Sequence, residues 1–192
     1  GRCNGKVAVA CFASNVARLK TIFQAASANG RAVALVGRSL WRINAAARET
    51  GYLTDLPEFL EPEKMAAMDD SEILYICTGS QGEPRAALTR IAADDHRSVK
   101  LGEGDTVIFS SRIIPGNELA IGRLHNSLIR QGADVISEND EDIHVSGHPA
   151  RGELTEMYQL VRPQILIPVH GEQRHLKKHA ELGAECQVPD SV

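Results

Sequence analysis

Strand-like and helix-like segments alternate along almost the whole of this chain of 192 residues. Short runs of apolar and β-branched residues are followed by segments whose apolar residues recur at helical spacing. Strands are expected at 6–11, 32–36, 73–77, 105–109, 133–136 and 164–168. Helices are expected at 15–28, 39–49, 117–130, 149–162 and 171–182, with one more opened by Pro84. This alternation predicts an α/β fold with a doubly wound, mostly parallel sheet.

Several helix boundaries carry residues that commonly begin or end helices. Ser14 is a candidate N-cap for the helix at 15–28, because its hydroxyl can accept a hydrogen bond from the first turn. Pro84 suits a first-turn position, and Gly183 is expected to end the last helix.

The composition is that of a globular protein with a sizeable core, with 43% hydrophobic and 24% charged residues. No run of eighteen apolar residues and no basic-then-apolar leader is present, so neither a membrane span, a membrane partner nor a signal peptide is expected. Four cysteines form no C-x-x-C pair, and Cys11 and Cys77 end apolar runs. Reduced, buried thiols of a cytoplasmic protein are therefore expected. The net charge of −4 argues against a nucleic-acid coat over the whole chain but leaves room for a local basic groove.

Two glycine-containing loops after predicted strands are candidate phosphate sites. In the loop at 78–84, glycine lets backbone amides approach an anion, although a plain turn explains the loop equally well. In the loop at 110–118, the hydroxyls of Ser110 and Ser111 beside Arg112 can hold a phosphate. The alternative for this loop is a surface turn with Asn117 capping the next helix.

Two histidines stand in loops where a hydrophobic run gives way to a helical pattern. His148 follows Ser146 and Gly147, and this group suits a phosphate or a leaving-group oxygen. His170 precedes a glycine and is expected to project from the end of a strand, where α/β folds often place their chemistry. A single histidine is more often structural, but two such loops raise the weight of a functional interpretation.

An ordered set of short motifs resembles the ribonuclease J branch of the beta-CASP nucleases, which have a metallo-β-lactamase fold. The motifs are Phe12-Ala13-Ser14-Asn15, Gly37-Arg38-Ser39, Thr78-Gly79-Ser80-Gln81-Gly82-Glu83-Pro84, Ser110-Ser111, Ile114-Pro115-Gly116-Asn117-Glu118, His144-Val145-Ser146-Gly147-His148 and Pro168-Val169-His170-Gly171-Glu172. The set spans nearly the whole chain, so the resemblance is highly specific.

The resemblance implies a beta-CASP domain at 1–137 and, at 138–192, the C-terminal return of a metallo-β-lactamase domain. A cluster of acidic residues at 138–142 is typical of a solvated loop and can equally mark this seam. The family cleaves RNA phosphodiesters with two zinc ions, as an endonuclease and as a 5′-to-3′ exonuclease that favours a 5′-monophosphate. Homo-oligomers are possible for the full-length parent.

The resemblance also implies roles for individual residues. His170 matches a zinc ligand, and His148 matches the signature histidine near the scissile phosphate. Ser146, Gly147 and His148 resemble the loop that holds a substrate phosphate, and Ser110 and Ser111 are assigned to the same task. Glu172 is either an orienting group for the metal ligand or a first-turn helix charge, and His144 is expected to be structural.

The metal-binding motif of the family, H-x-H-x-D-H, does not occur in this sequence. One histidine cannot hold a dinuclear zinc site, so the isolated chain is expected to be inactive. The alternative function is a non-catalytic RNA- or nucleotide-binding α/β module. A small-molecule metallohydrolase fits less well, because such enzymes lack the doubly wound insertion.

Overall fold

The computed structural model describes residues 2–145 and 147–191. The chain forms two compact units, Gly1–Val145 (unit 1) and Ser146–Val192 (unit 2). Unit 1 has two buried apolar clusters and unit 2 has one, so each unit is described by itself.

Unit 1 is built on a five-stranded parallel sheet with the strand order β2-β3-β1-β4-β5. The strands are β1 (Val7–Ala10), β2 (Ala32–Val36), β3 (Ile73–Cys77), β4 (Thr106–Phe109) and β5 (Asp134–Ile136). All five residues of β3 are buried, as expected for a strand covered on both faces of a parallel sheet. The predicted α/β fold with a doubly wound parallel sheet is confirmed.

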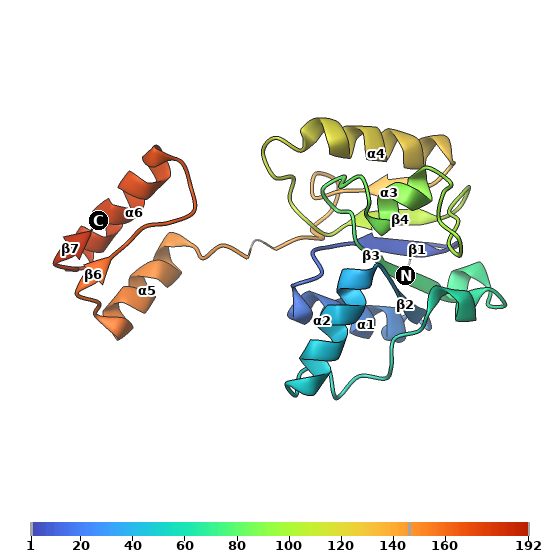
Figure 1. Cartoon of the computed structure of the whole chain (residues 1–192), viewed down its shortest axis with the longest axis horizontal. Helices are drawn as coiled ribbons and strands as arrows, with labels where there is room; N and C mark the ends of the chain where they lie inside the picture. Colours follow the sequence, from blue (N-terminus) through green and yellow to red (C-terminus); the bar gives the residue numbers. More distant parts are fainter. Residues whose placement is uncertain (1, 146, 192) are drawn as a thin grey trace. The chain divides into compact units, whose positions relative to one another are not determined.

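Helices cover both faces of this sheet (Figure 1). Helices α1 (Val16–Ala28) and α2 (Arg38–Glu49) pack on one face, and α3 (Ala87–Ala92) and α4 (Glu118–Arg130) pack on the other. The side chains of β3 alternate between the two faces: Leu74 and Ile76 join the α1–α2 side, whereas Tyr75 and Cys77 join the α3–α4 side.

The connection from α2 to β3 changes face by passing along the outer edge of β2. Leu60 donates its backbone N–H to Val33, and Leu35 donates its own to Leu60. This connection contains two 3-10 helices, η1 (Pro62–Met65) and η2 (Asp70–Glu72). Met65 is fully buried on the α3–α4 side, so this segment protects one edge of the sheet and completes its core.

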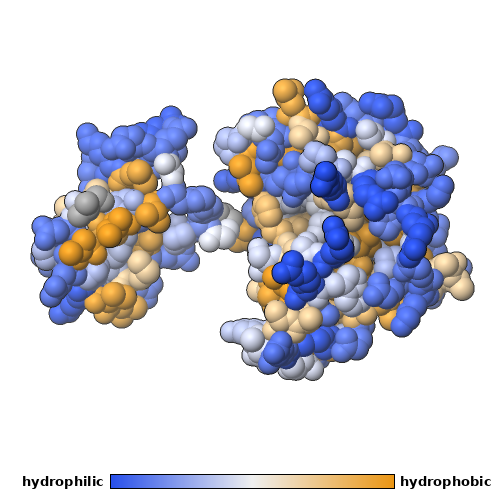
Figure 2. All heavy atoms as spheres, viewed as in Figure 1, coloured by the Kyte–Doolittle hydropathy of each residue, from blue (hydrophilic) through white to orange (hydrophobic). Residues whose placement is uncertain are grey.

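Unit 2 contains α5 (Arg151–Val161), β6 (Ile165–Leu166), α6 (Gln173–Glu185) and β7 (Asp190–Ser191). The two short strands pair in parallel. The buried cluster is small and consists of Tyr158, Leu166, Leu182 and Val188. Several apolar side chains of this unit remain exposed: Met157, Leu160, Val161, Ile165, Ile167 and Val169. Figure 2 shows hydrophobic residues on the visible face of this unit.

Two predicted helix starts in unit 1 are wrong by a few residues. The N-cap of α1 is Asn15 rather than Ser14, because the Asn15 side chain accepts a hydrogen bond of 3.0 Å from the Arg18 backbone amide. Helix α3 begins at Ala87 and not at Pro84, because Pro84 lies in a separate turn, closed by a hydrogen bond from the Ala86 amide to the Glu83 carbonyl.

The predicted end of the last helix at Gly183 is also wrong, because α6 continues to Glu185. A Cβ atom on Gly183 would meet the terminal methyl group Cδ2 of Leu166. The glycine therefore permits close packing of α6 on β6, and it does not terminate the helix.

All four cysteines are free, and Cys11 and Cys77 are buried as predicted. Burial raises the pKa of Cys11 to about 11 and raises the pKa of Cys77 as well. These thiols remain protonated at neutral pH and serve as small core residues. Among the helices of residues 2–145 and 147–191, none is long and apolar enough to span a membrane.

Truncation of a core leucine on α3 tests the packing of the sheet. Leu88 is 0% exposed, so Leu88→Ala is expected to lower the free energy of unfolding by about 2–5 kcal/mol. The control Leu119→Ala, at a side chain 77% exposed on α4, is expected to change it by less than about 0.5 kcal/mol. Urea unfolding followed by the fluorescence of Trp41, the only tryptophan, measures both; equal effects would contradict this packing.

Candidate functional site

The two histidines singled out by the sequence lie side by side in unit 2. His148 belongs to the segment before α5, and His170 belongs to the turn before α6. Their ring centroids are 5.3 Å apart, with an angle of 31° between the ring planes. Both side chains are exposed, so two imidazoles from separate loops are presented together at the surface of this unit.

The turn that carries His170 has an unusual backbone. His170 adopts a left-handed conformation with φ of 65°, which residues other than glycine rarely take and which is often found at functional sites. Strand β6 ends at Leu166, so His170 lies in the turn four positions beyond the strand. The expected projection directly from a strand end is therefore corrected, because the strand is shorter than its apolar run.

Glu172 is the N-cap residue of helix α6. Its backbone amide donates to Nδ1 of His175 at 3.2 Å, and its carboxylate pairs with Arg174 at 2.9 Å. Both charged side chains of this pair are largely exposed. These contacts favour the interpretation of Glu172 as a helix charge, placed at the N-cap position just before the first turn.

An imidazole nitrogen is a common ligand for zinc, and His170 presents one at the surface of unit 2. Zinc in proteins ordinarily has three or four protein ligands. Among residues 2–145 and 147–191, no group of three His, Cys, Asp or Glu side chains comes close enough to hold a metal ion. The donor chemistry fits zinc, and a complete site needs ligands besides those described.

In unit 1, a single guanidinium joins the serine loop to the segment that precedes Val145. Arg18 donates to the Ser110 carbonyl at 2.6 Å, to the Ser110 hydroxyl at 2.8 Å and to Nδ1 of His144 at 2.8 Å. Its second terminal nitrogen donates to the Val145 carbonyl at 3.0 Å. Arg18 thus fixes the course of the chain just before Ser146.

The Arg18 contact also determines the charge of His144. Because Nδ1 accepts a hydrogen bond from a guanidinium, this nitrogen carries no proton. Burial, and then the charge of Arg18, hold the pKa of His144 below its ordinary value. His144 is therefore a neutral structural group, in agreement with the expectation for this residue.

The serine candidates differ in whether their hydroxyl groups are already used in hydrogen bonds. The Ser110 hydroxyl donates its one proton to the Ile143 carbonyl at 2.7 Å and accepts from Arg18. The Ser111 side chain is buried and makes no hydrogen bond within the described part of the chain. Gly147 is exposed, with open space where a Cβ would be. The Ser146 candidate lies outside the described residues.

Gln81 is a positioning residue that sequence reasoning did not identify. Its side-chain amide donates to the Arg112 carbonyl at 2.9 Å, and its side-chain oxygen accepts from the Ile114 amide at 3.0 Å and from the Asn117 side chain at 3.2 Å. Gln81 is 5% exposed, so these bonds hold two loops together in a dry environment. Its sequence signals are its place in the family motif at 78–84 and a polar side chain inside a glycine-rich loop.

These contacts bear on the alternatives for both loops. The Gln81 backbone amide already bonds the Glu83 carboxylate at 2.9 Å, which favours a plain turn at 78–84. Arg112 pairs with Glu138 at 3.2 Å. Asn117 stands at the N-cap position of α4, but its side chain bonds Gln81 and makes no capping hydrogen bond.

The fold and these sites match two known domain families. Residues 4–128 match the model of the beta-CASP domain of ribonuclease J. Residues 135–189 match the model of an RNA specificity domain of Zn-dependent metallo-hydrolases. A beta-CASP domain is thus followed by a segment of a metallo-hydrolase, and the chain belongs to the ribonuclease J family.

Curated relatives agree with this family. The chain is 48% identical over 185 residues to ribonuclease J of Sinorhizobium meliloti and 47% identical over 186 residues to that of Mycolicibacterium smegmatis. Both alignments cover 96% of this chain and 33% of the relative. Ribonuclease J of Helicobacter pylori is 39% identical over 188 residues, which are 97% of this chain and 27% of that protein. The chain therefore spans about a third of the length of these relatives.

The Arg18–His144 contact predicts a titration that NMR can follow. The midpoint for His144 is expected below the ordinary value of 6.5, and Arg18→Gln is expected to raise it, because one of the two main causes is removed. His96, whose pKa is lowered by burial and by Arg90, is the control and is expected to stay unchanged. Because folding disfavours the protonated form of His144, this residue destabilises the fold as the pH falls below 6.5. A wild-type midpoint at or above 6.5 would refute this account.

Proposed function

We propose that the chain forms the beta-CASP domain and the C-terminal return of the metallo-β-lactamase domain of a zinc-dependent ribonuclease. The observation that carries the proposal is the match of both segments to domains of this family, at up to 48% identity to proteins named ribonuclease J. The substrate is RNA with a 5′-monophosphate, and the reaction is endonucleolytic and 5′-to-3′ exonucleolytic cleavage of phosphodiesters. Four free cysteines support a cytoplasmic location.

The proposed domains are 1–137 and 138–192. The acidic cluster at 138–142 supports a seam at this point. The exposed apolar side chains of unit 2 and its small buried cluster support a segment that is one part of a larger domain. A two-stranded sheet is only marginally stable by itself, which agrees with this assignment.

The proposed roles of the two histidines follow from their chemistry. His170 holds a zinc ion through its imidazole, together with ligands outside the described residues. Zinc, when bound, lowers the pKa of a coordinated water and stabilises charge on phosphoryl oxygens; two ions are proposed for the full-length parent. His148, whose ring lies beside that of His170, protonates or stabilises the departing oxygen.

The proposed phosphate-binding residues are Ser146, Gly147 and His148 in unit 2 and Ser110 and Ser111 in unit 1. Ser111, with its hydroxyl uncommitted among the described residues, is the stronger serine candidate. Ser110 acts through the network that it forms with Arg18 and Ile143, which fixes the chain before Ser146.

A second candidate function is a non-catalytic RNA-binding module. It uses the same phosphate-directed groups without a metal. Metal dependence separates it from the ribonuclease.

Replacement of His170 tests the proposed metal ligand. In the proposed full-length parent, His170→Ala is expected to abolish zinc occupancy and RNA cleavage together. Metal analysis of the purified variant and a cleavage assay with 5′-monophosphorylated RNA measure both. Cleavage retained in this variant would refute the assignment of His170 as a ligand.

Replacement of His148 is expected to affect the cleavage rate but not the zinc content. His148→Ala is expected to slow the chemical step by about 10²–10⁴-fold, the range for general acid catalysis, while zinc content stays near that of the wild type. Single-turnover cleavage and metal analysis separate the two quantities. If zinc is lost together with activity, His148 holds the metal or the structure and is not the proton donor.

A further inference from the structure

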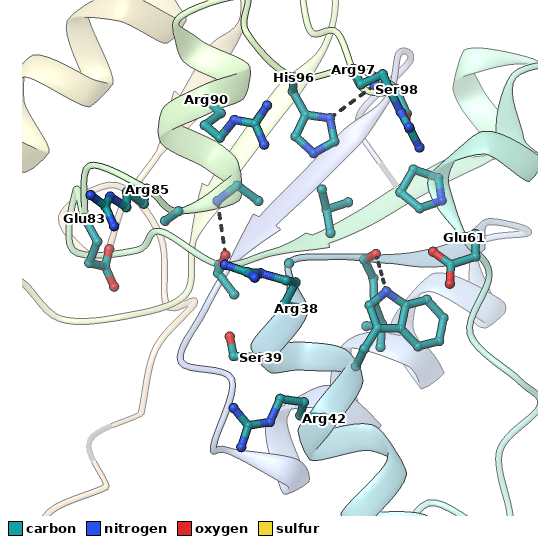
Figure 3. A pocket seen from close by; sticks show the side chains of 18 of the residues that line it. Arg38, Ser39, Arg42, Glu61, Glu83, Arg85, Arg90, His96, Arg97 and Ser98 are labelled. Atoms are coloured by element: carbon teal, nitrogen blue, oxygen red, sulfur yellow. Dashed lines mark hydrogen bonds between the residues drawn. The ribbon is translucent and has the colours of Figure 1, made fainter.

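A groove opens in unit 1 at the carboxyl ends of β2 and β3, between α2 and the segment that contains α3. Its volume is about 1070 Å³. Figure 2 shows strongly hydrophilic side chains around a hollow in this face of the unit, and Figure 3 shows arginines on both sides of it. None of the serines and histidines proposed to bind phosphate or metal lines this groove.

The lining of the groove is positively charged in an acidic chain. Five arginines face three glutamates, which leaves two positive charges in excess, whereas the whole chain carries −4. The arginines are Arg38, Arg42, Arg85, Arg90 and Arg97, and the glutamates are Glu61, Glu63 and Glu83.

Three of these arginines have no side-chain partner among the described residues. Arg90 pairs with Asp95 and Arg97 pairs with Glu63, each at 3.3 Å. Arg38, Arg42 and Arg85 are exposed, and none has a side-chain hydrogen bond or ion pair within residues 2–145 and 147–191. Arg38 and Arg42 lie on α2, and Arg85 lies in the segment before α3, on the opposite side of the groove (Figure 3). Exposed guanidinium groups without a partner can bind phosphate oxygens through two parallel N–H···O hydrogen bonds.

The interior of the groove adds a neutral donor. Nδ1 of His96 accepts hydrogen bonds from the backbone amides of Ser98 and Val99, at 3.3 and 3.2 Å. The ring proton therefore resides on Nε2, and the ring points into the groove (Figure 3). Burial, and then the charge of Arg90, lower the pKa of His96, so the imidazole stays neutral at neutral pH.

We propose that this groove binds the backbone phosphates of single-stranded RNA, with Arg38, Arg42 and Arg85 as the contacting cations. The identification of the ligand as RNA rests on the proposed function. The groove is open and its arginines are exposed, so a single small anion would contact few of them at once and be held weakly. A chain of phosphates contacts several cations together and releases counterions from each. Since arginine contacts to phosphate read no bases, the groove positions RNA without selecting its sequence.

The test is the binding of RNA to the 192-residue chain in EDTA, without metal. A 3′-fluorescein-labelled oligouridylate of about 16 nucleotides, near the upper size for one single-strand site, is followed by fluorescence anisotropy. The paired substitution Arg38→Gln with Arg85→Gln removes one cation from each side of the groove. The control pair is Arg123→Gln with Arg130→Gln, which changes the net charge equally at exposed α4 residues outside the groove.

The groove pair is expected to raise the Kd about tenfold and to reduce the slope of log Kd against log salt by about 1.4, or about 0.7 for each phosphate that no longer meets an arginine. The control pair is expected to change the Kd by less than about twofold, because its charges are screened from the groove. Thermal unfolding of each variant verifies that it is folded.

Three results would overturn the proposal: no binding by the wild-type chain, equal weakening by both pairs, or displacement of the oligonucleotide by uridine monophosphate at equal phosphate concentration. The last result would identify a site for small anions. Absence of groove binding, together with loss of cleavage in His170→Ala, leaves the ribonuclease assignment intact. Groove binding together with retained cleavage in His170→Ala contradicts only the metal assignment.

Discussion

The parallel alignment of five strands is the constraint on which the rest of unit 1 depends. Since all five strands run in the same direction, every loop that follows a strand emerges at one edge of the sheet. This edge carries Arg18 after β1, Arg38 after β2, Thr78 after β3 and Ser110 after β4. The two polar features of the unit, the Arg18 network and the basic groove, are neighbouring parts of this one edge.

Arginine plays two physically different roles at that edge. The Arg18 guanidinium has four acceptors, so its hydrogen-bonding capacity is used in fixing Ser110 and the chain at 144–145. Arg38 and Arg85 have no such acceptors within the described residues and remain exposed. A satisfied guanidinium orders structure, whereas an exposed, unpaired one attracts anions. Residue type alone therefore does not assign a role.

Unit 2 exposes more large apolar side chains than it buries. Its four buried apolar residues are fewer than its exposed ones of similar size. Gly183 lies against the side chain of Leu166, so a larger residue at this position of α6 would displace the Leu166 terminal methyl group. The same unit presents the adjacent rings of His148 and His170 at its surface.

The sequence by itself determined the alternation of strands and helices, the family motifs and the two histidine loops, because hydrophobic periodicity and glycine-bearing turns are local properties. Strand β3 has its predicted bounds, Ile73–Cys77. The tertiary structure alone decided that Gly183 lies inside a helix, that Asn117 bonds Gln81 instead of capping, and which arginines are paired. Arg38 and Arg85 stand 47 positions apart, and only the order β2-β3 in the sheet brings their loops to one groove. Such pairings depend on contacts distant in sequence, which no local pattern encodes.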